Sequence, residues 1–404
     1  MWPLIGKIDF SRIRKIQLSR EKMKRFLEKD RSDPTLVSFR HLERLTDGTG
    51  LLEHALGKIP RRKEGYTTDD NARALWVCVE WYPHVSAMKQ GNHLKDKLLR
   101  LIDRYLSFLL WVQREDGSFH NNIGYHLLPE QELPSDDCLG RALWACAVTY
   151  CKLPDPERQI AVQEMFVKGA ARAKDLTFPR GWAYVLSASS LLLQHHENMK
   201  KQHADPFHHF IESALPSFVE GFEEKLTALY RKHASKEWRW FEPAMTYGNG
   251  LLPWSLFCAY QVTRRQETLD IAKESLDFLI EKMTGEKGCI SPIGNKGWCT
   301  QTSRSQWDQQ PLDVMKLALA VSEADKTLGQ MTYREVLEKC RAWYYGENDL
   351  GVPMVHAEEG SCYDGLTSSG PNLNQGAEST LSYLLTEVLY RNRASHSERS
   401  ISGV

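Results

Sequence analysis

The chain has 404 residues, of which 42% are hydrophobic and 26% charged, and its 52 basic residues balance 52 acidic residues. These proportions are typical of a soluble globular protein. A formal net charge of zero argues against nucleic acid or an anionic membrane surface as the partner. No apolar run is long enough to cross a bilayer, so no membrane span is expected.

The cysteines and the N-terminal residues indicate in which cellular compartment the protein resides. The N-terminal residues lack the apolar core of a signal peptide. The nine cysteines form no CxxC pair, and most fall within helical apolar patterns, which indicates free buried thiols rather than disulfides or a zinc site. We therefore expect a cytoplasmic protein that holds no metal and no other cofactor.

Apolar residues recur with the 3.6-residue period of helices along nearly the whole chain, and strand-like alternation is nearly absent. The first helix is expected at about Arg12–Lys29, within an N-terminal helical segment of residues 1–35. Helices rich in small residues are expected to begin near Thr68, Ser135, Pro179, Thr246, Trp307 and Asn374. More strongly amphipathic helices alternate with them, at Lys95–Gln113, Glu157–Lys174, Pro206–His233, Glu267–Met283 and Tyr333–Tyr345.

This alternation predicts six helix pairs that repeat roughly every 45 to 65 residues, a period typical of helical arrays. The small-residue helices can pack tightly inside a ring, and the amphipathic helices can cover them with their charged faces outward. We predict an all-α fold, an (α/α)6 toroid that residues 1–404 form as one domain. An open solenoid is the alternative.

One sequence unit occurs twice, at Thr68–Trp76 and Ser135–Trp144, and reads hydroxyl, two aspartates, then Arg-Ala-Leu-Trp. The hydroxyl is a natural helix N-cap, and the helix dipole favours aspartates in the first turn. Carboxylates are therefore expected at the starts of these helices. Asp and Arg four residues apart can form an ion pair along a helix, and this spacing occurs at Asp69 with Arg73 and at Asp137 with Arg141.

The loops before the small-residue helices should gather at one mouth of the ring, and they combine aromatic residues with carboxylates and amides. Sugars need both, because their C–H faces stack on aromatic rings and their hydroxyls bond to amides and carboxylates. Hydrolysis of a glycosidic bond needs one protonated and one ionised carboxyl group. Several Asp and Glu residues close together in one pocket supply such a pair, because their mutual repulsion moves their pKa values apart. The candidate catalytic residues are Asp70, Asp136, Asp137, Asp308 and Glu378.

Within this set, Asp308 beside Trp307 is predicted to be the general acid, because aromatic surface raises the pKa of a carboxyl group. Asp70 or Asp136, which lack an arginine four residues on, should be the base. Helix starts that face each other across a ring suit an inverting enzyme. The candidate substrate-binding residues are Tyr66, Arg73, His120, Arg141, Trp182, Glu242, Tyr247, Asn249, Trp298, Trp307, Gln309, Asp364 and Asn374.

A purely structural role is an alternative for some of these residues. Capping alone would explain one aspartate of each Asp-Asp pair, and Glu242 is as well suited to a helix cap as to a substrate ligand. We nevertheless expect one pocket to bring together residues from all six loop regions, namely Tyr66, Asp70, Asp136, Trp182, Glu242, Trp307, Asp308 and Glu378.

Five segments carry a resemblance to a known family: Gly65–Leu75, Gly140–Trp144, Trp240–Glu242 with Thr246-Tyr247, Asp308–Pro311 and Asn374–Thr380. They resemble a bacterial family of six-hairpin, glycosidase-like (α/α)6 proteins, which occur alone or fused to glycosyltransferase domains. The resemblance spans about Asp47 to Tyr390 and implies a toroid with carbohydrate-active chemistry. Family members often carry an aspartate where this chain has Gly248, so no carboxylate role transfers to that position.

The leading hypothesis is a glycoside hydrolase that cleaves an oligosaccharide in the mouth of the toroid. A sugar epimerase or isomerase is the first alternative, but it would be expected to place two or more histidines in the pocket, and only His120 and His126 are near it. The second alternative is a non-catalytic glycan-binding protein that could associate with a glycosyltransferase.

Overall fold

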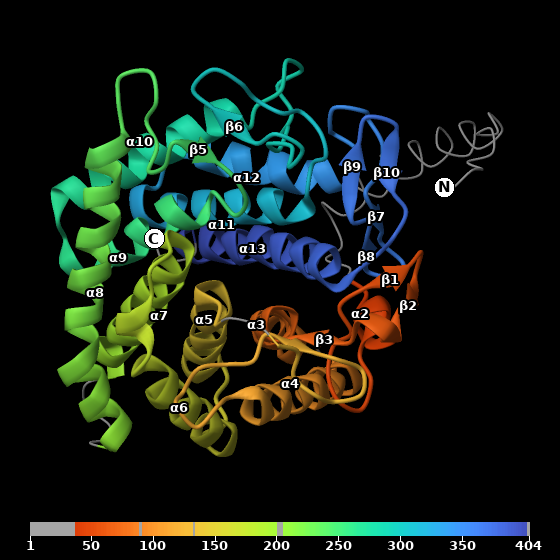
Figure 1. The fold of residues 1–404 in the computed structure, drawn as a ribbon, viewed down its shortest axis with the longest axis vertical. Helices are drawn as coiled ribbons and strands as arrows, with labels where there is room; N and C mark the ends of the chain where they lie inside the picture. The colour runs from red at the N-terminus through yellow and green to blue at the C-terminus, as the bar shows by residue number, and fades with distance from the viewer. Residues whose placement is uncertain (1–36, 89–90, 132–133, 200–204, 402–404) are drawn as a thin grey trace.

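The structure is a computed structural model that describes residues 37–88, 91–131, 134–199 and 205–401. The helix expected at about Arg12–Lys29 lies outside these residues. Helices dominate the fold, and they alternate along the chain between two sets (Figure 1). A short helix, α2 (Arg40–Leu45), precedes both sets.

The first set consists of the small-residue helices that the sequence predicts, which we call the inner helices. They are α3 (Thr68–Ser86), α5 (Asp136–Lys152), α7 (Pro179–Met199), α9 (Leu251–Thr263), α11 (Pro311–Leu328) and α13 (Ala377–Ile401). The second set, the outer helices, comprises α4 (Asn92–Val112), α6 (Pro156–Ala170), α8 (Pro206–His233), α10 (Gln266–Lys282) and α12 (Met331–Tyr344). The predicted helices are therefore present in the described part of the chain, although α9, α11 and α13 begin a few residues later than expected.

The inner helices form a closed ring. Each inner helix packs against the next along the chain, and α13 packs against α3. Each outer helix packs against the inner helix that precedes it in the chain. This arrangement confirms the (α/α)6 toroid, and the open solenoid is wrong because contact between α13 and α3 closes the circle.

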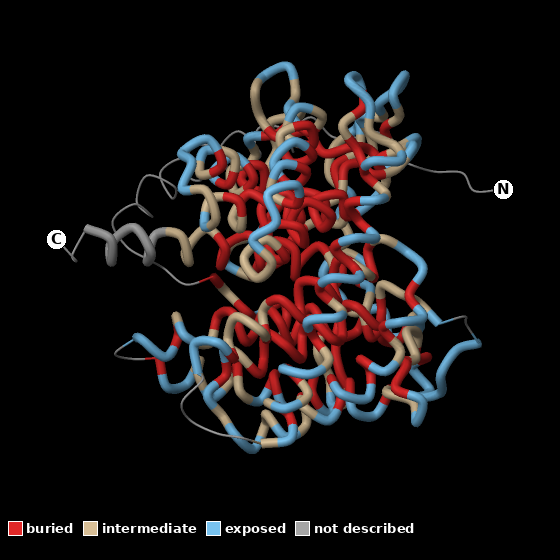
Figure 2. Tube along the Cα trace, turned by 90° about the vertical axis from the view of Figure 1, so that its left-hand side faces the viewer, coloured by how far each residue is buried: buried red, intermediate tan, exposed pale blue. Residues whose placement is uncertain are grey.

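Burial explains which helices lie inside. Helix α5 is buried at every position from Cys138 to Tyr150, whereas α10 buries only one face. A helix that is buried all round must lie between other elements, and a helix with one apolar stripe belongs on the outside. Figure 2 shows this division as a buried interior within an exposed surface.

The strands are short antiparallel pairs in the loops that precede inner helices. They are β1 (Ala55–Leu56) with β2 (Ile59–Pro60), β3 (Tyr66–Thr67) with β4 (Asn122–Ile123), β5 (Ala244–Met245) with β6 (Cys299–Thr300), β7 (Val355–His356) with β8 (Ser361–Cys362), and β9 (Gly365–Thr367) with β10 (Gly370–Asn372). Because β3 joins β4 and β5 joins β6, loops from different helix pairs are tied together at one end of the ring.

All nine cysteines are unpaired, as the sequence predicts. Within the described residues, no helix combines the length and the apolar character needed to span a membrane.

Close helix packing in the ring requires small residues at particular positions. A Cβ atom at Gly250, where α9 begins, would lie 2.1 Å from the backbone oxygen of Lys316 on α11. A Cβ atom at Gly140 on α5 would lie 2.8 Å from Cβ of Tyr184 on α7. Side chains at these positions would push neighbouring inner helices apart.

We expect Gly250→Ala to lower the free energy of unfolding by about 1–3 kcal/mol, the usual cost of overpacking a core. Gly221→Ala on α8 is the matched control, because a Cβ atom there meets nothing within 4 Å. The control should gain up to about 1 kcal/mol, since alanine favours a helix over glycine. Denaturant unfolding of both variants checks this, and equal stability changes in the two would contradict the close approach of α9 and α11.

Candidate active site

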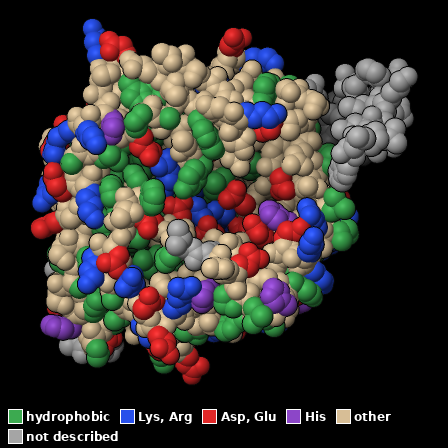
Figure 3. Space-filling view, viewed as in Figure 1, with side chains coloured by type: hydrophobic (Ala, Val, Ile, Leu, Met, Phe, Trp, Pro, Cys, Tyr) green, Lys and Arg blue, Asp and Glu red, His purple; other side chains and the backbone are tan. Residues whose placement is uncertain are grey.

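A cavity of about 800 Å³ opens at the end of the ring where the inner helices begin, and we call it the front cavity. Its lining comes from the loops before the inner helices and from the first turns of α3, α5, α11 and α13. Among the described residues, seven acidic residues and two arginines line it, and Figure 3 shows charged side chains gathered in a hollow on this face. The acidic residues are Glu53, Asp69, Asp70, Asp136, Asp137, Asp364 and Glu378.

Helix caps place the Asp-Asp pairs at the cavity wall. The Ser135 hydroxyl caps α5 by accepting a hydrogen bond from the backbone N–H of Cys138, as predicted. In α3 the cap is Thr67 rather than Thr68, and it accepts from the backbone N–H of Asp70. The aspartates of each pair therefore lie in the first turn of the helix, where the dipole favours negative charge.

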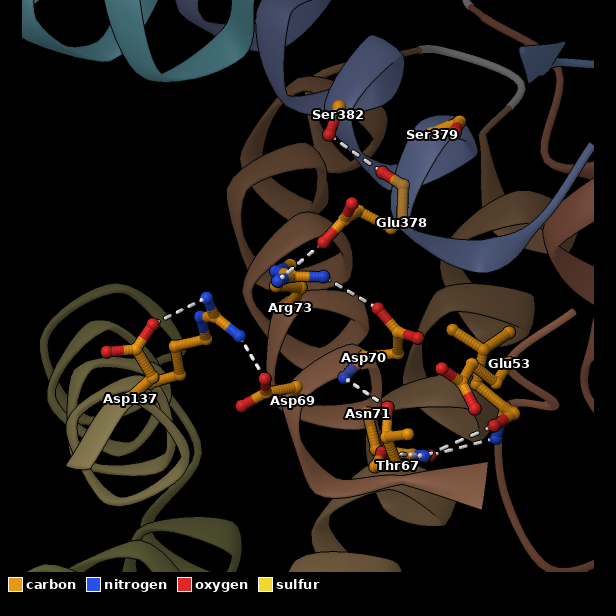
Figure 4. Close-up of polar contacts among 12 residues, drawn as sticks. Glu53, Thr67, Asp69, Asp70, Asn71, Arg73, Asp137, Glu378, Ser379 and Ser382 are labelled. Carbon is orange, nitrogen blue, oxygen red and sulfur yellow. Dashed lines mark hydrogen bonds and ion pairs between the residues drawn. The ribbon is translucent and has the colours of Figure 1, made fainter. Parts of the chain in front are cut away.

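Arg73 holds two carboxylates that come from different helices. Its Nη1 lies 2.7 Å from Oδ1 of Asp70 on α3, and its Nη2 lies 2.9 Å from Oε2 of Glu378 on α13. Figure 4 shows the guanidinium between these two carboxylates. Arg73 is only 3% exposed, so its charge depends on these partners for stabilisation.

Arg141 makes the same arrangement between α3 and α5. It pairs with Asp69 and with Asp137, whose Oδ2 lies 3.2 Å from Nη2. The Tyr247 hydroxyl donates to the same Oδ2 of Asp137 at 3.0 Å. The predicted Asp137–Arg141 pair is confirmed. The predicted pairing of Asp69 with Arg73 is wrong, because Asp69 turns away from Arg73 towards the Asp137 side (Figure 4).

Asp136 is not the free carboxylate that its sequence spacing suggested. Its Oδ2 accepts hydrogen bonds from the backbone N–H groups of Thr177 and Phe178, at 2.6 and 2.7 Å. These residues lie directly before α7. Asp136 therefore fixes the start of α7 against α5, although it also lines the front cavity.

Several carboxyl groups of the front cavity have raised pKa values. Burial raises the pKa of Asp70 to about 7 against the opposing charge of Arg73, and the charges of Glu378 and Glu53 add to the rise. Burial also raises the pKa of Glu53, together with the charge of Glu378, and burial raises that of Asp364. Asp70 is therefore a carboxyl group of this cavity that is protonated in much of the protein at neutral pH.

Of the predicted site residues, nine line the front cavity. They are Asp70, Arg73, Asp136, Asp137, Arg141, Tyr247, Trp298, Asp364 and Glu378. The sequence reasoning missed Glu53, which lies beside Asp70 in Figure 4. The only signal for Glu53 was its position just after a polar turn at residues 47–50 that precedes the Thr-Asp-Asp motif.

Asp308 does not line the front cavity. The predicted convergence is wrong for it and for Tyr66, Trp182, Glu242 and Trp307, which also lie outside the lining. Oδ2 of Asp308 lies 3.4 Å from Nζ of Lys296, and its carbonyl accepts from the backbone N–H of Asn295. Trp307 next to it packs against the hydrophobic core. The loop before α11 therefore presents Asn295 and Trp298 to the cavity instead.

Three other predicted site residues lie outside the cavity lining and form contacts that hold the loops in place. Tyr66 is buried and donates to Asp47, and Glu242 is held by both its oxygens at 2.9 Å from Nη1 of Arg180. The buried Asn249 donates to the Thr246 carbonyl at 2.7 Å.

The remaining four also lie outside the lining and hold backbone or neighbouring side chains. Gln309 donates to the carbonyl of Gln306, Asn374 accepts from the N–H of Gly57, and Trp182 donates to the carbonyl of Leu176. The His120 ring bonds to Arg114, while its carbonyl accepts from the Thr68 hydroxyl. These contacts shape the cavity without reaching it. Within the described ranges, no group of three or more His, Cys, Asp or Glu is arranged to hold a metal ion.

The raised pKa of Asp70 predicts a pH-dependent stability. A carboxyl group with a pKa of about 7 when folded and about 3.9 when unfolded contributes stability below pH 4 that is lost as the pH rises through 7. The stability of Asp70→Asn relative to the wild type should therefore improve as the pH rises from about 4 to about 7. Denaturant unfolding across this range measures the difference.

Asp116→Asn is the control for this experiment. Hydrogen bonds from Ser118 lower the pKa of Asp116, so Asp116 titrates below about pH 4 and this variant should run parallel to the wild type between pH 4 and pH 7. Parallel pH curves for Asp70→Asn and the wild type would contradict the assignment.

Comparison with solved structures identifies the fold. A cellobiose 2-epimerase from Bacillus thermoamylovorans aligns over 93% of this chain and 100% of its own, with 10% identity and a TM-score of 0.63. A D-mannose isomerase aligns over 96% and 98%, with 11% identity and a TM-score of 0.61. A GH76 α-mannanase from Bacteroides thetaiotaomicron aligns over 97% and 98%, with 10% identity and a TM-score of 0.57.

No family model matches the sequence, and no curated protein is significantly similar to it. The likeness therefore rests on the course of the backbone. The chain shares the (α/α)6 toroid fold with these proteins over nearly its whole length.

Proposed function

We propose that the protein is a glycoside hydrolase that cleaves a neutral oligosaccharide in the front cavity, with Asp70 as general acid and Glu378 as general base. The observation that carries this proposal is the pair of carboxyl groups that Arg73 holds at the cavity wall, one of them with a raised pKa. The similar structures are a cellobiose 2-epimerase, a D-mannose isomerase and an α-mannanase. All three names refer to carbohydrates, and this supports a carbohydrate as the substrate.

Asp70 suits the role of the acid. Its Oδ1 accepts from Arg73, and its Oδ2 has no hydrogen-bond partner among the described residues. A carboxyl group with a pKa of about 7 is protonated in much of the protein at neutral pH. Oδ2 can then donate its proton to the glycosidic oxygen as the bond between that oxygen and the anomeric carbon breaks.

Glu378 suits the role of the base. Its side chain is 38% exposed, far more than that of Asp70, and it lies in the first turn of α13, where the helix dipole favours the ionised form. Its Oε2 binds Arg73, and the carboxylate can take a proton from a water molecule that attacks the anomeric carbon.

The arrangement favours inversion of the anomeric carbon. Asp70 and Glu378 bind different nitrogens of one guanidinium, so the guanidinium separates their carboxyl groups. Inverting hydrolases hold their carboxyl groups further apart than retaining ones, about 6.5–9.5 Å against about 5–5.5 Å, to leave room for water.

The charges of the front cavity favour water over phosphate as the attacking group. Both arginines already bind two carboxylates each, and seven acidic residues line the cavity. A phosphate, a sugar phosphate or a uronic acid would meet excess negative charge, and no arginine among the described lining residues is left unpaired to bind it. Neutral sugars avoid this repulsion.

The described lining of the front cavity has too few histidines for the epimerase alternative, which would be expected to place two or more of them in the pocket. Among the described lining residues, His54 is the only histidine, and its Nε2 lies 3.3 Å from Oε1 of Glu53. His120, which the sequence placed near the pocket, is bonded to Arg114 instead. The carboxyl groups are therefore the better candidates for proton transfer in this cavity.

We expect Asp70→Asn and Glu378→Gln each to lower kcat by about 10²–10⁴, the usual contribution of a general acid or base. Turnover of a panel of neutral oligosaccharides is measured first with the wild type and then with the variants. Asp308→Asn is the matched control and should keep near-normal kcat, because Asp308 lies outside the cavity lining.

A strong loss of kcat in Asp308→Asn with little loss in Asp70→Asn would overturn the assignment of the acid. If every sugar that binds remains uncleaved, the protein is a glycan-binding protein and the hydrolase proposal fails.

A second prediction concerns the product. ¹H NMR of a fresh digest should show the anomer opposite to that of the substrate, since inversion changes the configuration at the anomeric carbon. Added inorganic phosphate should neither raise the rate nor yield a sugar 1-phosphate. Retention of configuration, or a phosphate-dependent rate, would contradict the proposed geometry or the choice of water.

A further inference from the structure

A second cavity, of about 770 Å³, lies at the opposite end of the ring, where the inner helices end, and we call it the rear cavity. Its lining includes the last turns of α3, α5 and α11 and a late turn of α13. No described residue lines both cavities. The ring therefore has two separate openings, and the proposed hydrolysis uses only the front one.

A buried layer separates the two cavities. The Lys316 Nζ donates to the Tyr184 hydroxyl at 2.6 Å, and both residues are fully buried in the centre of the ring. Lys316 Nζ also lies 5.5 Å from the ring centre of Trp76, which lines the rear cavity. On the front side, the guanidinium of Arg141 lies 5.8 Å from the ring centre of Tyr184.

Three tryptophans form the floor of the rear cavity. Trp144 packs edge-on against Trp76 and Trp254, with ring centres 5.4 and 4.7 Å apart. The indole Nε1 of Trp144 is buried and has no acceptor among the described residues. An aromatic floor suits a ligand that has apolar faces, and the polar side chains around it suit a ligand that also has hydroxyl groups.

Fixed polar groups stand around this floor. Glu80 accepts from the Trp76 Nε1 at 3.1 Å and from Nζ of Lys152 at 2.7 and 2.8 Å, and it is only 7% exposed. Across the cavity, Glu323 binds Lys326 at 3.2 Å and accepts from Gln261. Because these groups hold one another, they are already ordered before a ligand binds.

The charges of the rear cavity are balanced pair by pair. The cation–acid pairs are Lys152 with Glu80, Lys326 with Glu323, Arg334 with Asp325, and Arg393 with Glu338. An anionic ligand would have to displace an acid from its cation, whereas hydroxyl groups can bond to paired lysines and carboxylates without breaking a pair.

We propose that the rear cavity is a second saccharide-binding site, which binds a neutral mono- or disaccharide without cleaving it. Its volume lies in the usual range for a small-molecule site, about 300–1,000 Å³. The site would let the protein hold one sugar at the rear while the front cavity acts on another. This inference does not depend on the proposed hydrolase activity.

The test uses protein labelled with ¹⁵N-tryptophan and a panel of neutral glucose and mannose disaccharides, with inorganic phosphate as a separate arm. The indole N–H signals of Trp76 and Trp144, assigned from Trp→Phe variants, should shift on titration with a disaccharide and not with phosphate. Glu378→Gln, which alters only the front cavity, should keep these shifts with unchanged affinity.

Ser322→Phe is designed to fill the rear cavity from α11 and should weaken the binding seen at these signals by about tenfold or more. Leu191→Trp fills it from α7 and replaces Ser322→Phe if that variant does not fold. Ser217→Phe on the exposed surface of α8 is the matched control and should leave binding unchanged. Turnover at the front cavity should persist in all three variants.

Three results would overturn the proposal. The first is the absence of any shift at the highest soluble sugar concentration. The second is a shift that survives both filling variants, which would place the ligand elsewhere. The third is a response to phosphate alone, which would identify an anion site.

Discussion

Two buried arginines hold together the starts of three inner helices, and the geometry of the front cavity depends on them. Arg73 joins α3 to α13 through Glu378, and Arg141 joins α5 to α3 through Asp69. Taking such charges out of water costs several kcal/mol per ion, and the pairing of each guanidinium with two carboxylates offsets this cost. The carboxylates at the mouth are therefore needed to neutralise the arginines, and the arginines fix where those carboxylates lie.

The same pairing links closure of the ring to chemistry. The contact of α13 with α3 closes the toroid, and the Arg73–Glu378 ion pair crosses this contact. Burial keeps the pKa of Asp70 near 7 despite the adjacent guanidinium of Arg73. A ring that is stabilised by ion pairs thus holds, at its mouth, a carboxyl group that exchanges its proton near neutral pH.

The centre of the ring keeps its two ends apart. Burial and the charges of Arg73 and Arg141 lower the pKa of Lys316, and the amine bonds to Tyr184 beneath the front cavity. The tryptophans on the far side then face a cavity whose cations and acids are already paired. The front is strongly acidic and the rear is nearly neutral, so the two openings differ in the ligands that they can accept.

The sequence by itself determined the helical class, the alternation of small-residue and amphipathic helices, and the capped Asp-Asp starts of α3 and α5. These features depend on spacing along one helix, and the 3.6-residue period and the capping hydroxyls encode them locally. For the same reason the Asp137–Arg141 pair, four residues apart on α5, was predictable.

Only the tertiary structure decided which acids face which arginines. Asp69 pairs with an arginine on the next inner helix, and Glu378 reaches an arginine on the other side of the ring closure. Glu53 joins the site although only its position after a polar turn pointed to it, and Asp308 stays outside the site although Trp307 beside it suggested a pocket residue. The rotation of each helix about its axis and the path of each loop set these contacts, and both are fixed by packing between segments far apart in the chain.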